Sequence, residues 1–68
     1  GDEHPKVAIR RNNLGSAWDA KGEYDKAIEY FKLAFNTFKT TLGEQHPNTQ
    51  IALQSLQHAQ KKLGEKND

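Results

Sequence analysis

The chain has 68 residues, of which 34% are hydrophobic and 28% are charged, so it holds at most one small domain. Its ten basic and nine acidic residues are interspersed and give a net charge of +1, which argues against a nucleic-acid-binding or membrane-surface protein. It contains no cysteine, which excludes disulfides, thiol nucleophiles and cysteine-ligated zinc, and no apolar run approaches the roughly 20 residues of a membrane span.

A first helix is expected over residues 5–21. Pro5 suits the first turn of a helix, where its missing N–H costs nothing. The apolar residues at helical spacing predict one buried stripe, made of Val7, Leu14, Ala17 and Trp18. A short turn at Lys21, Gly22 and Glu23 then follows.

The clearest helix is predicted over residues 24–42. Apolar side chains recur there every three or four positions, as Ala27, Ile28, Phe31, Ala34, Phe35, Phe38 and Leu42. Gly43 comes next, and glycine can adopt the left-handed conformation that often ends a helix.

A third helix is expected over residues 47–63, with an end at Gly64 and a frayed tail over residues 65–68. Its apolar stripe is narrower and consists of Ala52, Leu56, Ala59 and Leu63. No segment shows the alternation of a β-strand, so the sequence predicts an all-α fold, in which an antiparallel helical hairpin is followed by one further helix.

The chain repeats itself at an offset of 42 residues, which is the distance from His4 to His46. Repetition at such a spacing is typical of a solenoid, in which each unit covers the hydrophobic face of the next. The residues that recur are the pairs Gly1 and Gly43, His4 and His46, Pro5 and Pro47, Ile9 and Ile51, Leu14 and Leu56, and Ala17 and Ala59.

With the helices placed, one set of residues resembles the tetratricopeptide repeat pattern, namely Leu14, Gly15, Trp18, Gly22, Tyr24, Ala27, Phe31 and Ala34. In that pattern small residues let two helices approach, and aromatic residues fill the space between them. The 42-residue unit and its Gly-x-x-His-Pro start resemble the variant found in kinesin light chain and in many bacterial repeat proteins.

The resemblance divides the chain into a complete repeat unit at residues 1–42 and a further helix at residues 43–68. The second part departs from the pattern, because Gln57 stands where Gly15 would recur and Gln60 stands where Trp18 would recur. The third helix is therefore either a polar cap or the first helix of a unit that continues. The imperfect repetition favours a natural sequence over an idealised design.

Tetratricopeptide repeats, as the resemblance implies, bind peptides or protein partners on a concave face built from the first helix of each unit. Asparagine offers both donors and acceptors to a ligand backbone, which makes Asn12 and Asn13 the preferred candidates over merely solvated surface residues. Carried onto this sequence, the face comprises Asn12, Asn13, Ser16, Asp19, Gln54, Ser55, His58 and Lys61.

The sequence predicts no enzyme, no metal site and no cofactor. His4 and His46 are equivalent residues one unit apart, which favours a role at helix starts, and His58 has no histidine or carboxylate four residues away to complete a zinc pair. Four carboxylates are expected at exposed helix positions or in the turn, where charge favours solubility rather than acid–base catalysis, namely Asp19, Glu23, Asp25 and Glu29. No glycine-rich sequence for phosphate binding occurs.

The alternative to a peptide-binding scaffold is a self-assembly element that forms a homo-oligomer. A helical pair and one extra helix would leave part of the apolar stripes half covered, with Phe35, Phe38, Leu56 and Leu63 as the candidates for self-association. Residues 1–8 have neither the charged nor the apolar region of a signal peptide, so a soluble, cytoplasmic protein is expected.

Overall fold

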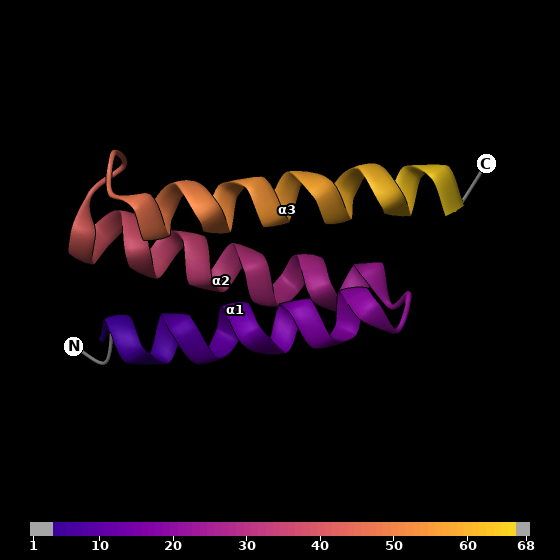
Figure 1. Ribbon diagram of the computed structural model, residues 1–68, viewed down its shortest axis with the longest axis horizontal. Helices are drawn as coiled ribbons and strands as arrows, with labels where there is room; N and C mark the ends of the chain where they lie inside the picture. The colour runs from indigo at the N-terminus through magenta and orange to yellow at the C-terminus, as the bar shows by residue number, and fades with distance from the viewer. Residues whose placement is uncertain (1–3, 67–68) are drawn as a thin grey trace.

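The computed structural model describes residues 4–66, which form three α-helices and no strand within that range (Figure 1). The helices are α1 (Pro5–Ala20), α2 (Tyr24–Leu42) and α3 (Pro47–Lys66). The all-α prediction is confirmed, and the predicted starts of the helices coincide with the observed ones.

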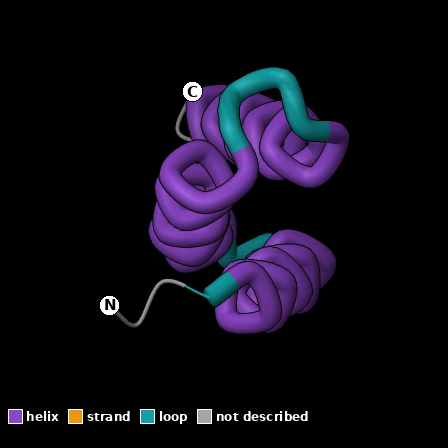
Figure 2. The backbone as a smooth tube through the Cα atoms, turned by 90° about the vertical axis from the view of Figure 1, so that its left-hand side faces the viewer, coloured by secondary structure: helices purple, strands orange, loops and turns teal. Residues whose placement is uncertain are grey.

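The three helices lie side by side and antiparallel in chain order, so α2 is the central helix (Figure 1). Viewed along the helices, α1 and α3 both pack against α2 but make little contact with each other (Figure 2). This places α1 and α3 as the two walls of one face of the molecule, with α2 behind them.

Two histidines one repeat apart cap the helices that they precede. His4 Nδ1 accepts a hydrogen bond from the backbone N of Lys6 at 3.0 Å, and His46 Nδ1 accepts one from the backbone N of Asn48 at 3.1 Å. A side-chain acceptor at this place satisfies a backbone N–H that has no partner within the helix. The sequence prediction that both histidines act at helix starts is therefore confirmed.

The core consists of two clusters along α2, of which the first joins all three helices and the second joins α2 and α3. The first cluster is Ala8, Ala34, Phe38 and Ala52, with Phe35 and Leu42 packed against it. The second is Ala27, Phe31, Leu56 and Ala59, with Trp18 and Ile28 packed against it. The helices α2 and α3 therefore share both clusters, whereas α1 joins the first through Ala8 and borders the second through Trp18.

The predicted buried stripe of α1 is partly wrong. Leu14 is 47% exposed and Ala17 is also exposed, whereas the fully covered residues of α1 are Ala8 and Gly15. Successive residues are about 100° apart around a helix, so a face centred on Gly15 turns Leu14 to the side. The spacing of apolar residues predicted that large side chains such as Leu14 are buried, but the residues of α1 that α2 covers fully are the small Ala8 and Gly15.

Gly15 is small for a physical reason. A Cβ atom built on it would lie 2.6 Å from Cε1 of Phe31, closer than such atoms approach in proteins. The phenyl ring of Phe31 therefore packs directly on the backbone of α1, which brings the two helices together.

The third helix does not end at Gly64 as predicted but continues to Lys66. The Nζ atom of Lys66 donates a hydrogen bond to the carbonyl oxygen of Gly22 at 3.1 Å, which ties this end of α3 to the turn between α1 and α2. The predicted fraying of residues 65 and 66 is wrong, and residues 67–68 lie outside the described range.

Gly43 has positive φ as expected, but at φ 92° and ψ 159° it is extended rather than left-handed helical. That region is essentially restricted to glycine. The carbonyl of Gly43 accepts a hydrogen bond from Oγ1 of the fully buried Thr49 at 2.7 Å, so the bend and the first turn of α3 hold each other in place.

Replacing Gly15 by alanine tests the close approach of α1 and α2. We expect Gly15→Ala to be less stable than Gly64→Ala by about 1–3 kcal/mol, because only the first forces a methyl group into a side chain. Gly64→Ala meets nothing within 4 Å and gains up to ~1 kcal/mol of helix propensity. Urea unfolding followed by circular dichroism measures both, and equal stabilities would contradict the packing described.

Replacing Thr49 by valine tests the bend before α3. Valine keeps the shape but removes the donor to Gly43, so we expect a loss of about 1–2 kcal/mol in the free energy of unfolding. The matched control is Thr40→Val at an exposed position of α2, which should stay within ~0.5 kcal/mol of the parent. A similar effect of both changes in thermal unfolding would exclude a structural role for this hydrogen bond.

Candidate functional site

The face between α1 and α3 contains two adjacent hollows, which together form a groove with α2 as its floor. The first hollow measures about 290 Å³ and is mostly apolar, and its lining residues are Ile9, Asn12, Phe38, Asn48 and Ile51. The second measures about 230 Å³ and is mostly polar, and its lining residues are Ser16, Asp19, Phe31, Gln54, Ser55 and His58.

Two side-chain oxygens in this groove are buried without a hydrogen-bond partner. They are Oδ1 of Asn12, a residue that lines the first hollow, and Oδ1 of Asp19, a residue that lines the second, and neither atom has a hydrogen-bond partner among the described residues. A buried acceptor without a partner costs on the order of 1–3 kcal/mol. Asn12 and Asp19 are seven positions apart on α1, which is about two helical turns. Their side chains therefore lie on the same side of the helix, about 10 Å apart along its axis.

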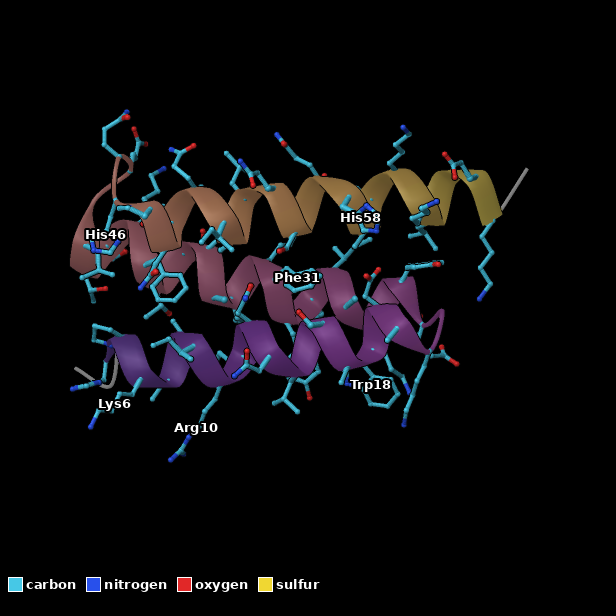
Figure 3. The ribbon with its side chains drawn as sticks, viewed as in Figure 1. Lys6, Arg10, Trp18, Phe31, His46 and His58 are labelled. Atoms are coloured by element: carbon cyan, nitrogen blue, oxygen red, sulfur yellow. The ribbon has the colours of Figure 1, made fainter. Side chains whose placement is uncertain are left out.

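His58 and Asp19 face each other across the second hollow. Nε2 of His58 lies 3.7 Å from Oδ2 of Asp19, and Figure 3 shows His58 on the side of α3 that faces the other helices. The pair is an ion pair only when the imidazole is protonated, and at this distance and exposure it contributes at most ~1 kcal/mol. It therefore does not seal the groove.

The sequence comparisons identify the family of this fold. A sequence profile described as Tetratricopeptide repeat matches residues 7–48, which is more than half of the chain. The chain belongs to the tetratricopeptide repeat family. The resemblance found in the residue pattern is thereby confirmed, and repeats of this family generally serve as scaffolds for protein interactions.

One relative of this tetratricopeptide repeat chain is the Clustered mitochondria protein homolog of Xenopus tropicalis. It is 30% identical over 53 residues, which is 78% of this chain but 4% of that protein. The chain thus corresponds to a small part of the relative's length. No solved structure gives a significant match.

Six of the eight residues predicted for the concave face of the repeat line the groove, and two do not. Asn13 and Lys61 are exposed and are absent from the lining of both hollows. The six that the structure brings together are Asn12, Ser16, Asp19, Gln54, Ser55 and His58. Their proximity supports the predicted face, while their contact with a partner stays a prediction.

Sequence reasoning missed the apolar half of the groove. Ile9 and Ile51 are 43% and 52% exposed and stand in the first hollow above Phe38, with Asn48 beside them. A signal for the two isoleucines was present, because they form a pair at the 42-residue offset. Equivalent residues of the first helix in each unit face the same groove, so this pair could have been placed from the repeat alone.

The residues predicted for self-association are mostly covered within the tetratricopeptide chain itself. Phe38 is 3% exposed and Leu56 is 8% exposed, so the expectation that they are half covered is wrong. Both pack in the core clusters because α2 lies between α1 and α3. Phe35 and Leu63 are half-buried as expected, and their role in self-association stays a prediction.

Trp18 is held at the edge of the core. It packs half-buried against the second core cluster, and the ammonium groups of Lys26 and Lys21 lie 4.4 Å and 5.3 Å from its ring centroid. A cation over an aromatic ring is attracted to its negative face. The ring thus completes the α1–α2 packing of the repeat, away from the groove-lining residues.

Residues 4–66 hold no group of three or more histidine, aspartate or glutamate side chains placed to bind a metal ion. Among the three helices none is both long enough and apolar enough to span a bilayer.

Replacing Asn12 by leucine tests whether its oxygen is an unsatisfied acceptor. Leucine has a similar size and removes the buried polar atom, so we expect Asn12→Leu to stabilise the free protein by about 1 kcal/mol. Asn13→Leu, at the exposed neighbouring position, should change stability by less than ~0.5 kcal/mol. Destabilisation by Asn12→Leu in urea unfolding would mean that this oxygen is already satisfied in the free protein.

Proposed function

We propose that this chain acts as a protein-interaction scaffold that binds an extended peptide segment of a partner in the groove between α1 and α3. The observation that carries the proposal is the groove itself, in which six side chains of the predicted concave face lie beside the exposed Ile9 and Ile51.

The chemistry of the groove suits a peptide backbone. Asn12 and Asp19 line the two hollows, so the amide NH2 group of Asn12 can donate to a backbone carbonyl, and Oδ2 of Asp19 can accept from a backbone N–H, whatever the ligand sequence. The apolar hollow beside Ile9 and Ile51 can take one aliphatic side chain of the ligand. The second hollow, lined by Ser16 and Ser55, offers hydroxyl groups to a polar side chain.

The alternative predicted from the sequence is self-assembly into a homo-oligomer, with Phe35, Phe38, Leu56 and Leu63 as the candidates for self-association. What weakens it is that α2 already packs against both α1 and α3, so a neighbour would find no free apolar face on α2. The groove therefore has the stronger support as the functional surface.

Peptide selection tests this proposal. We expect a random peptide library displayed on phage to yield ligands for the immobilised protein, and the double variant Asn12→Ala, Asp19→Ala to bind them at least tenfold more weakly. Two lost hydrogen bonds at about 1 kcal/mol each account for that factor. Fluorescence anisotropy of the selected peptides measures the dissociation constants.

The control is Asn36→Ala, which removes an exposed amide from α2 outside the groove lining. It should leave the affinity unchanged. Failure to select any peptide, or equal binding to the double variant and the parent, would remove the support for the groove.

A further inference from the structure

The second hollow holds a carboxylate to which the chain itself offers no permanent cation. Asp19 lines this hollow, and its side chain is 25% exposed. Its Oδ1 is buried, so Oδ2 is the oxygen that a ligand would meet. Among residues 4–66, the basic group that forms an ion pair with it is the imidazole of His58, at 3.7 Å, which is a cation only when protonated.

The lysines around this end of the groove are engaged elsewhere. On α3, Nζ of Lys62 lies 3.6 Å from the carboxylate of the glutamate three residues later, and Nζ of Lys66 donates to a carbonyl in the turn between α1 and α2. The ammonium groups of Lys21 and Lys26 lie over the ring of Trp18, which projects away from α3 (Figure 3). The negative charge in the second hollow is therefore left for a ligand to neutralise.

The place of Asp19 within α1 also favours a cation. Asp19 lies in the last turn of the helix, and that turn contains no basic residue. The carbonyl end of a helix carries a partial negative charge, which stabilises cations and disfavours carboxylates. A cation in the second hollow would thus be attracted both by the carboxylate and by the end of α1. The hydrogen bond from Lys66 to the carbonyl of Gly22 already brings one cation to this end of the helix.

We propose that the second hollow selects for one basic side chain, an arginine or a lysine, of the peptide that binds in the groove, a specificity that rests on the function proposed above. The hollow measures about 230 Å³, less than the roughly 300–1,000 Å³ of small-molecule pockets, so it suits a single side chain. The hydroxyl groups of Ser16 and Ser55 supply further acceptors for the donors of a guanidinium or an ammonium group. An acidic side chain would instead be repelled by Asp19.

The two hollows set the distance between this basic side chain and an apolar one. Asn12 and Asp19 line the first and the second hollow from α1, and Ile51 and His58 do so from α3. Each pair is seven positions apart, which is about 10 Å along a helix. In an extended peptide of polyproline II conformation, every third side chain lies on the same side, about 9 Å further along. We therefore expect an aliphatic residue in the ligand three positions from the basic one.

Peptides selected from a random phage library on the immobilised protein test this specificity. We expect most of them to carry an arginine or a lysine three positions from an aliphatic residue. In the tightest of these peptides, replacing the basic residue by glutamine should weaken binding at least tenfold in fluorescence anisotropy. The difference between the basic peptide and its glutamine version should shrink as salt is raised, because partly exposed charges are screened.

Variants of the chain assign the selectivity to Asp19. Asp19→Asn keeps the shape and removes the charge, so it should bind the basic peptide at least tenfold more weakly but the glutamine version as the parent does. His58→Lys places an ammonium group beside Asp19 and should also weaken binding of the basic peptide. The control is Glu29→Gln, which removes an exposed carboxylate of α2 outside the groove lining and should leave both affinities unchanged.

The possible results separate this specificity from the proposed function. Selected peptides without a basic residue that still bind the double variant Asn12→Ala, Asp19→Ala more weakly would overturn the specificity and leave the groove as the binding site. Equal losses for the basic peptide and its glutamine version in Asp19→Asn would overturn it as well, because the charge would then have no part. Failure to select any peptide would overturn the groove, and the specificity with it. Circular dichroism checks that each variant keeps its helicity.

Discussion

The contact between Gly15 and the ring of Phe31 is the constraint on which the rest of the molecule depends. With no side chain at Gly15, the ring rests on the backbone of α1 and fixes how closely α1 and α2 approach. The same ring forms part of the second core cluster with Leu56 of α3 and part of the floor of the second hollow. One aromatic side chain thus sets the hairpin, holds the third helix and shapes the groove.

Two phenylalanine side chains belong both to the core and to the lining of the groove. Phe31 and Phe38 belong to the two core clusters and also line the two hollows. The base of the groove is therefore held in place by the core, since moving either ring would open a core cluster. What can adapt to a ligand are the polar side chains at the rim, such as Gln54 and His58, which are exposed.

The helices and the family could be predicted from the sequence because both depend on local patterns. The prolines, the spacing in α2 and the 42-residue echo gave the fold class and the helix starts. The buried face of α1 could not be found this way, because the contact is made by Ala8 and Gly15, whose small side chains carry little apolar signal. Leu14 carried the stronger signal and is exposed.

The candidate site was predictable in composition but not in its chemistry. Repeat geometry alone gathers Ser16, Asp19 and His58 on one face, as the resemblance implied. The preference between Asn12 and Asn13 could not come from the sequence, since they are adjacent asparagines, of which the fold leaves the first half-buried and the second exposed. The end of α3 was missed because the hydrogen bond from Lys66 to Gly22 joins residues far apart in the chain.

Three glutamines on α3 make the two flanks of the molecule different. Where α1 presents Ala8, Gly15 and Trp18 to α2, the repeat places Gln50, Gln57 and Gln60 on α3. A helix that approached α3 as α2 approaches α1 would have to strip water from three amides, while the opposite flank of the molecule offers Leu14. The two flanks of the molecule therefore differ in what they would offer a further helix, since one presents an exposed leucine and the other presents three glutamines.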